Sequence, residues 1–161
     1  MSVALDDLDQ KILDLLLRDG RAPASQLADQ VGLSRPAVAE RIEKLERAGV
    51  VRGTTVVLDP QSLGRAVTAF VAARGPKLDA KGTKRFHELM ERDDVLEVHT
   101  VAGEDCYLIK VRTETIPSLN ALLNELTSPP ISLSTRTTIV METHCEKVGG
   151  IVLGREGRER R

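Results

Sequence analysis

The sequence predicts an α+β chain in which an N-terminal winged helix-turn-helix domain is joined to a ferredoxin-like domain. Three observations lead to this prediction. Apolar residues recur at helical spacing over residues 8–45, and β-prone segments alternate with helical ones after residue 66. Residues 59–65, which contain Pro60, separate the helical pattern from the segment that alternates between strand and helix. A length of 161 residues suits one domain or two small ones.

The first helix is predicted from a stripe of leucine and isoleucine. This stripe begins at Leu8, continues through Ile12 and ends at Leu16, with the i, i+4, i+8 spacing of one helix face. Asp6 stands just before the stripe, where a short acidic side chain caps free N–H groups and favours the helix dipole. Gly20 marks the end of this helix.

Two further helices follow, joined by a turn that contains glycine. The second begins near Ser25, and Gly32 suits the left-handed position at its end. The third begins after Ser34, a good N-cap, and ends at Gly49. Its inward face is predicted to carry Val38, Ile42 and Leu45. Two short helices with such a turn form a helix-turn-helix.

Residues 50–60 predict the wing of this first domain. They hold two short β-prone pieces around Gly53, which is typical of a hairpin. The first domain is therefore expected to span residues 1–58, and residues 59–65 are expected to act as a hinge.

The rest of the chain follows the order β-α-β-β-α-β, the split βαβ arrangement of a ferredoxin-like domain over residues 66–143. Helix 115–127 is predicted to bury Ile116, Leu119, Leu123 and Leu126. The predicted strands are 66–74, 95–102, 107–113 and 134–142, and the other helix is 80–92. The tail, 144–161, is rich in glycine and arginine and is expected to be partly disordered.

Composition narrows the function classes. The net charge of −1 does not indicate a bulk nucleic-acid binder, and three aromatic residues are too few for a single-strand stacking platform. Two cysteines form no disulfide framework and no metal-ligand spacing. The acidic N-terminus resembles no secretory signal and no apolar run suits a membrane span, so a cytoplasmic location away from membranes is expected.

The third helix carries the candidate DNA-reading residues. In a helix-turn-helix the N-terminal residues of the second helix of the motif meet base edges in double-stranded DNA. Arg35 suits a bidentate contact with guanine, and Pro36 and Ala39 suit a thymine methyl group. The remaining candidates are polar residues suited to capping or phosphate contacts: Ser25, Gln26, Ser34, Arg41, Lys44 and Arg47. The alternative is that this face, which also carries Glu40 and Glu43, is merely solvated.

The sequence resembles the Lrp/AsnC family, the feast/famine transcriptional regulators. LDDLDQKIL, DGR, VGLS, ERIEKLE and GVVRG follow one another in the order and spacing of that family's DNA-binding head. VAGEDCYLIKVR and STRTTIVME resemble its effector-binding domain, which is ACT-like. The resemblance covers residues 4–142. It implies a regulator that binds DNA as a homodimer or a higher assembly, commonly an octamer, with a small effector, often an amino acid, and no cofactor.

The resemblance also implies where an effector would bind, between dimers, on the loop before the third strand and on the last strand. The positions carried over are Thr100, Gly103, Glu104, Asp105, Cys106, Tyr107, Thr135, Thr137, Thr138 and Ile139. Many relatives carry a second aspartate where this chain has Cys106. Which residue would bind the ammonium group of an amino-acid effector therefore stays open, and so does the identity of the effector. Cys106 is either a small pocket wall or a redox-sensing thiol.

Two other functions stay open at the level of sequence. Some proteins with this two-domain shape are decarboxylases of sirohaem-type tetrapyrroles, and His87, His99 and His144 would be their candidate residues here. No nucleophile-base pair, metal cluster or phosphate loop supports such an enzyme. The other alternative is a metabolite sensor whose head no longer binds DNA. We expect the chain not to be an enzyme.

Overall fold

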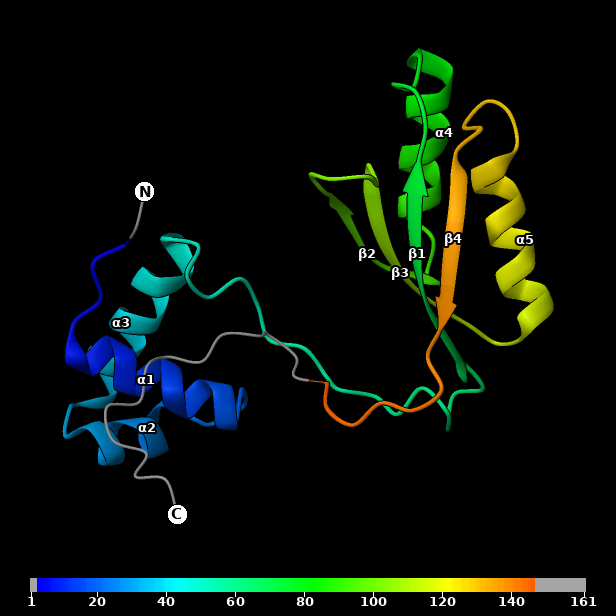
Figure 1. Cartoon of the computed structure of the whole chain (residues 1–161). Helices are drawn as coiled ribbons and strands as arrows, with labels where there is room; N and C mark the ends of the chain where they lie inside the picture. Colours follow the sequence, from blue (N-terminus) through cyan, green and yellow to red (C-terminus); the bar gives the residue numbers. More distant parts are fainter. Residues whose placement is uncertain (1–2, 147–161) are drawn as a thin grey trace. The chain divides into compact units, whose positions relative to one another are not determined.

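The computed structural model describes residues 3–146, shown in Figure 1. Contacts divide this part of the chain into two compact units, one that ends at Val57 and one that spans Leu58–Glu146. Most of the tail whose disorder was expected lies outside the described residues. None of the described helices combines the length and the apolar character that a bilayer span requires.

Three helices form the first unit, as predicted: α1 (Asp7–Arg18), α2 (Ala24–Val31) and α3 (Arg35–Arg47). A capping box starts α1, since the Asp6 carboxylate accepts from the N–H of Asp9 at 2.7 Å and the Asp9 carboxylate accepts from the N–H of Asp6 at 3.4 Å. The Ser34 hydroxyl accepts from the N–H of Ala37 at the start of α3, at 3.4 Å. The helix-turn-helix is therefore confirmed, together with its predicted caps.

The core of this head is small. Four buried residues from the three helices form it: Ile12, Leu27, Ala28 and Val38. Ile42 is only half-buried, while Leu45 is fully buried. The turn between α2 and α3 requires Gly32, whose φ of +73° lies in the left-handed region.

The predicted wing is wrong. No strand lies between α3 and the first strand of the second unit, and residues 52–59 are exposed. Val56, Val57 and Leu58 are 62%, 72% and 62% exposed. The β-prone composition of this stretch is real, but a β-strand needs a hydrogen-bonding neighbour, and the single chain supplies none here.

Residues 59–65, the predicted hinge, form a hydrogen-bonded turn. The Asp59 carboxylate accepts hydrogen bonds from the Ser62 hydroxyl and from the N–H groups of Gln61 and Ser62, the last two at 3.2 and 3.0 Å. The Ser62 hydroxyl, followed by these two N–H groups, lowers the pKa of Asp59. The N–H of Arg65 donates to the carbonyl of Pro60 at 2.8 Å. The turn is thus ordered by its own side chain, and its role as a hinge stays a prediction.

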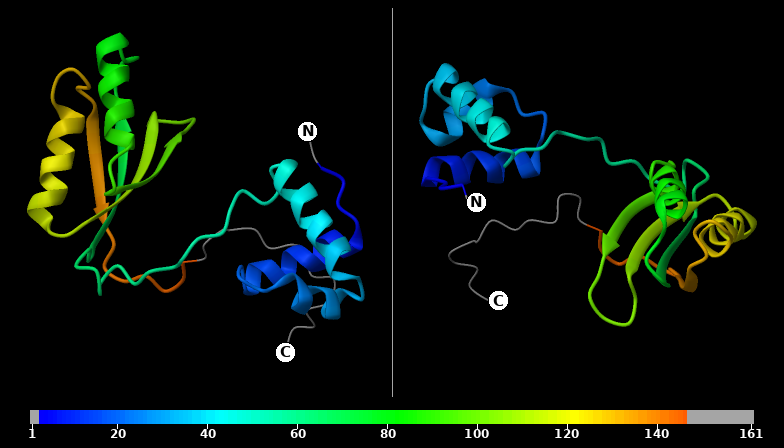
Figure 2. Two further views of the ribbon diagram at one scale, coloured as in Figure 1. Left: turned by 180° about the vertical axis from the view of Figure 1, so that it is seen from behind. Right: turned by 90° about the horizontal axis from the view of Figure 1, so that it is seen from above.

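The second unit is a four-stranded antiparallel sheet in the order β2-β3-β1-β4, with α4 and α5 on one face (Figure 2). This order confirms the predicted ferredoxin-like arrangement. The strands are β1 (Val67–Arg74), β2 (Val95–Thr100), β3 (Tyr107–Thr113) and β4 (Ser134–Ile139), and the helices are α4 (Ala80–Met90) and α5 (Ile116–Thr127).

The core of this unit lies between the sheet and its two helices. Ala69, Val71, Ile109 and Val111 of the central strands are fully buried there. From α5 the buried residues are Leu119, Leu122 and Leu126. The prediction for this helix was wrong at Ile116, which is 52% exposed, because the helix turns Leu122 inward and leaves Leu123 half-buried.

We predict that Gly32→Ala destabilises the head by about 1 kcal/mol, because a Cβ in the left-handed region meets the backbone. Apart from Gly32 and its two chain neighbours, no atom lies within 4 Å of the position that the added Cβ would take, so the loss comes from the backbone conformation and not from tertiary crowding. The measurement is denaturant unfolding followed by far-UV circular dichroism. Gly32→Asn is the control, since asparagine tolerates this conformation better. An equal loss in both variants would contradict the argument.

Candidate DNA interface and effector site

The N-terminal end of α3 is open to solvent. Ser34, Arg35 and Pro36 are exposed, and Ala39 is half-buried. Arg35 forms no ion pair within residues 3–146. Gln26, near the start of α2, is exposed. This end of α3 therefore presents a guanidinium and small apolar groups without an internal competitor.

Arg41, a predicted phosphate contact, instead turns inward to α1. Its Nη1 lies 2.7 Å from Asp6 Oδ2 and 2.6 Å from Asp9 Oδ1. Hydrogen bonds from the Asp9 N–H and the Arg41 guanidinium lower the pKa of Asp6, while the two carboxylates raise the pKa of Arg41. This contact could not be predicted from the spacing of residues, because the partners lie far apart along the chain.

The other two predicted phosphate contacts on α3 remain available. Lys44 and Arg47 are exposed, and both lie in the last turn of the helix. Arg47 Nε donates to the carbonyl of Glu43 at 3.3 Å, which leaves the outer guanidinium nitrogens free of described partners. Positive charge in the last turn of a helix also interacts favourably with the negative end of the helix dipole.

The loop between β2 and β3 carries four of the predicted effector residues, 103–106, in a hydrogen-bonded turn. The N–H of Val101 donates to the carbonyl of Cys106 at 3.0 Å, and the N–H of Cys106 donates to the carbonyl of Ala73 at 2.9 Å. Gly103 has a φ of +145°, a conformation that favours glycine. The Cys106 thiol is half-buried and lies 3.7 Å from the carbonyl oxygen of Gly75.

Asp105 is bonded to the last strand. Its Oδ2 lies 3.1 Å from Arg136 Nη2 of β4, and Asp105 is only 23% exposed at the side chain. Glu104, beside it, is exposed and forms no ion pair within the described part of the chain. Of the two acidic residues among the effector candidates, Glu104 is thus the one available to an ammonium group. Arg136 was missed by the sequence reasoning, although it stands between two of the selected threonines.

The strand order separates the two halves of the predicted effector site. Thr100 ends β2 and Thr137 lies on β4, and these strands are the opposite edges of the sheet. The contact between Asp105 and Arg136 links the loop to the start of β4. Thr135, Thr137 and Ile139 alternate with Thr138, which pairs with Phe70 and shares its face. Tyr107 begins β3, is half-buried and packs against the core residue Phe86, with the ring centroids 4.7 Å apart and the rings tilted.

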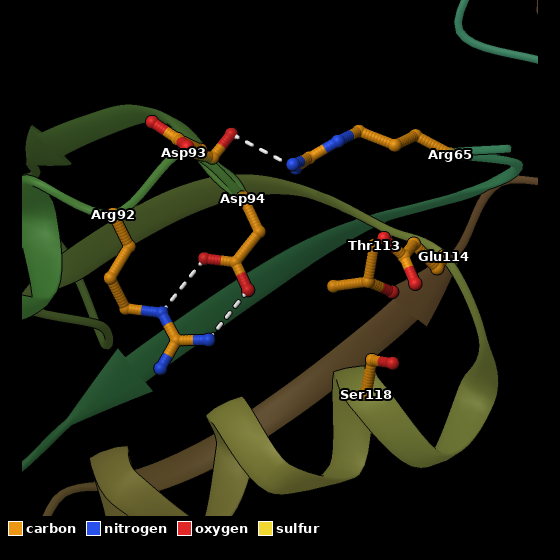
Figure 3. Close-up of a pocket in the computed structure, with 7 residues that line it drawn as sticks. All are labelled: Arg65, Arg92, Asp93, Asp94, Thr113, Glu114 and Ser118. Carbon is orange, nitrogen blue, oxygen red and sulfur yellow. Dashed lines mark hydrogen bonds and ion pairs between the residues drawn. The ribbon is translucent and has the colours of Figure 1, made fainter. Parts of the chain in front are cut away.

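A cavity of about 390 Å³ lies at the other end of this sheet (Figure 3). Arg92 Nε and Nη2 bind Asp94 Oδ1 and Oδ2 at 2.8 and 2.7 Å, and this pairing lowers the pKa of Asp94. Arg65 Nη1 donates to the carbonyl of Asp93 at 3.4 Å. Thr113, Glu114 and Ser118 complete the lining. Arg92 and Arg65 thus have partners within the lining, while Thr113 and Ser118 form hydrogen bonds with Thr115, which suits a solvated surface hollow.

The candidate residues of an enzyme lie on separate elements. His87 is an exposed residue of α4, and His99 of β2 lies 3.2 Å from Glu97. His144 follows β4 and is also exposed. Within residues 3–146, no group of three or more His, Cys, Asp or Glu residues is placed to hold a metal ion. That the chain is not an enzyme stays a prediction.

Comparison with known protein families assigns both units. The AsnC-type helix-turn-helix domain matches residues 5–46, and the Lrp/AsnC ligand binding domain matches residues 68–149. The chain belongs to the Lrp/AsnC family. It is a helix-turn-helix transcriptional regulator with a ligand-binding domain, as the resemblance of its motifs implied.

Relatives of this Lrp/AsnC regulator match over nearly its whole length. The HTH-type transcriptional regulator FL11 of Pyrococcus abyssi is 32% identical over 146 residues, which are 91% of this chain and 95% of that protein. LrpA of Mycobacterium tuberculosis is 34% identical over 145 residues, 89% of this chain and 94% of that protein. The crystal structure of LrpA matches with a TM-score of 0.76 at 32% identity, over 89% of this chain and 97% of that one.

A further solved structure shares the fold of this Lrp/AsnC regulator. It is the complex of the transcriptional regulator NMB0573 of Neisseria meningitidis with L-Met. The two chains are 23% identical, with a TM-score of 0.80, and the match covers 90% of this chain and 95% of that one.

Proposed function

We propose that this Lrp/AsnC regulator reads double-stranded DNA with the N-terminal end of α3. The observation that carries the proposal is the exposed guanidinium of Arg35, which has no ion-pair partner within the described residues. Pro36 and Ala39 supply the small apolar surface beside it. Lys44, Arg47, Ser25 and Gln26 are the phosphate contacts of this proposal, and Ser34 holds the start of the helix.

We predict that Arg35→Ala weakens binding to the specific site by about 1–3 kcal/mol and relaxes the preference at one base pair. The measurement is fluorescence anisotropy over a salt series, with the DNA upstream of the protein's own gene and a scrambled duplex. Arg18→Ala, which removes an exposed arginine of α1, is the matched control. If wild-type protein shows no selective binding at any salt, the proposal fails and a sensor without DNA becomes the better reading.

A small amino acid is the effector we propose for the ligand-binding domain. The N–H groups of Gly103 and Glu104 donate to no protein atom within residues 3–146, so they are available to a carboxylate. The exposed Glu104 carboxylate suits an ammonium group. The complex of NMB0573 with L-Met supports this ligand class. Thr100 of β2 and Thr137 of β4 lie on opposite edges of the sheet, and a second copy of the chain would bring the two edges together in one site.

We predict that one amino acid of a panel shifts DNA binding, and that Glu104→Gln weakens its effect about tenfold or more, because it removes a charge-assisted hydrogen bond. The measurement is the anisotropy titration repeated at increasing amino-acid concentration. Glu114→Gln is the control, because it removes an exposed carboxylate at the other end of β3. An effect of Glu104→Gln no larger than that of Glu114→Gln would remove Glu104 from the site.

A homodimer that assembles further, up to an octamer, is the state we propose in solution. The sheet face opposite α4 and α5 carries Phe70 and Leu108, which are 39% and 38% exposed. The extended stretch Val56–Leu58 adds three exposed apolar side chains and an unpaired backbone edge. Both features fit a second copy of the chain.

We predict that Phe70→Glu converts the dimer to monomer, because it replaces an apolar side chain of the paired face with a third carboxylate that association would have to desolvate. Sedimentation velocity measures the assembly state. Ile116→Glu is the control, since it changes an exposed apolar residue of α5 on the other side of the sheet. A dimer that survives Phe70→Glu would place the interface elsewhere.

A further inference from the structure

The middle of α3 is fastened to the first turn of α1 by a guanidinium shared between two carboxylates. Arg41 Nη1 lies 2.7 Å from Asp6 Oδ2 and 2.6 Å from Asp9 Oδ1. The Asp9 side chain is 3% exposed and that of Arg41 is 27% exposed. Asp6 and Asp9 are also bound to each other's backbone through the capping box.

This arrangement leaves Asp9 strongly dependent on Arg41. A buried carboxylate is costly unless it is paired, and removal of its partner leaves an uncompensated charge. The capping box gives Asp9 a backbone N–H at 3.4 Å, a weak contact beside the ion pair at 2.6 Å. A short contact with a charged donor also fixes direction, which apolar packing does not.

The same contact withdraws Arg41 from DNA. Both short contacts of its Nη1 are directed to α1, and a phosphate would have to compete with two carboxylates already in place. Lys44 and Arg47, by contrast, are exposed and reach no carboxylate among the described residues. The cations of α3 therefore divide into Arg41, which faces α1, and three that are exposed: Arg35, Lys44 and Arg47.

We propose that Arg41 is a positioning residue, which sets the placement of α3 against α1 and so aims Arg35 at the DNA. This inference rests on the proposed reading of DNA by α3. A recognition group must be held to within about half an ångström by its supporting contacts. The small apolar core of the head holds the helices together, and the ion pair with Asp9 and Asp6 fixes their relative placement.

The test separates positioning from phosphate contact through the salt dependence of binding. Arg41→Gln, Asp9→Asn and the double variant are compared with Lys44→Gln, each checked for folding by far-UV circular dichroism. Specific and scrambled duplexes are titrated by fluorescence anisotropy from low to high salt. A lost phosphate contact reduces the slope of log K against log[salt] by about 0.9.

We expect Arg41→Gln to weaken specific binding roughly tenfold, because a displaced α3 loses base discrimination of that order. Non-specific binding and the salt slope should stay unchanged. Asp9→Asn, which keeps every cation of the head, should produce the same loss, and the double variant should add little to it. Lys44→Gln should instead lower the salt slope for both duplexes.

The inference is overturned if Arg41→Gln lowers the salt slope as Lys44→Gln does while Asp9→Asn binds like wild type. Asp6→Asn covers the case in which Arg41→Gln does not fold, since asparagine keeps the helix cap and weakens only the ion pair. Asp6→Asn should then lower specific binding alone, and wild-type binding after Asp6→Asn would count against the inference. Failure of wild-type protein to bind DNA selectively would instead remove the proposed function on which the inference rests.

Discussion

The buried carboxylate of Asp9 is the constraint on which the DNA-binding head depends. The apolar core of the head is small, with Ile12, Leu27, Ala28 and Val38 at its centre. Apolar contact is favourable but non-directional. An ion pair across two helices adds a preferred geometry, and burial of one partner makes its loss costly. The head therefore combines a small apolar core with one ion pair between α1 and α3. Both set the position of the exposed end of α3.

The helix ends of the head could be predicted from neighbouring residues, whereas the ion pair between Arg41 and Asp9 could not. Caps such as Asp6 and Ser34, and the left-handed Gly32, act within a few residues of themselves, so the sequence predicts them directly. Arg41 and Asp9 are separated by 32 positions, and nothing in the spacing of either pairs them. A cation on a solvated helix face looks the same in sequence whether it faces phosphate or a neighbouring carboxylate.

The second domain shows the same limit in a sheet. The order of its elements was predictable, but the pairing of strands decides which side chains meet. Thr100 and Thr137 stood together in the expected effector site and lie on opposite edges of the sheet, while Arg136 joins the loop through Asp105. Strand composition also misled at residues 50–60, because β-propensity describes fit to a paired surface and the single chain offers no neighbour there.

The open face of the sheet joins apolar surface to charges that are already paired. Lys110 lies 3.4 Å from Glu97 Oε1 and also contacts Glu146, and Arg112 Nη2 lies 3.1 Å from Glu146 Oε2. Glu146 follows the last strand and supplies a partner to both cations, so two positive and two negative groups balance. A partner that covers a sheet face must remove water from the charges on it, and this is costly when those charges are unpaired. Because Lys110 and Arg112 are paired with carboxylates of their own chain, the same sheet face of a second copy can cover Phe70 without supplying counterions.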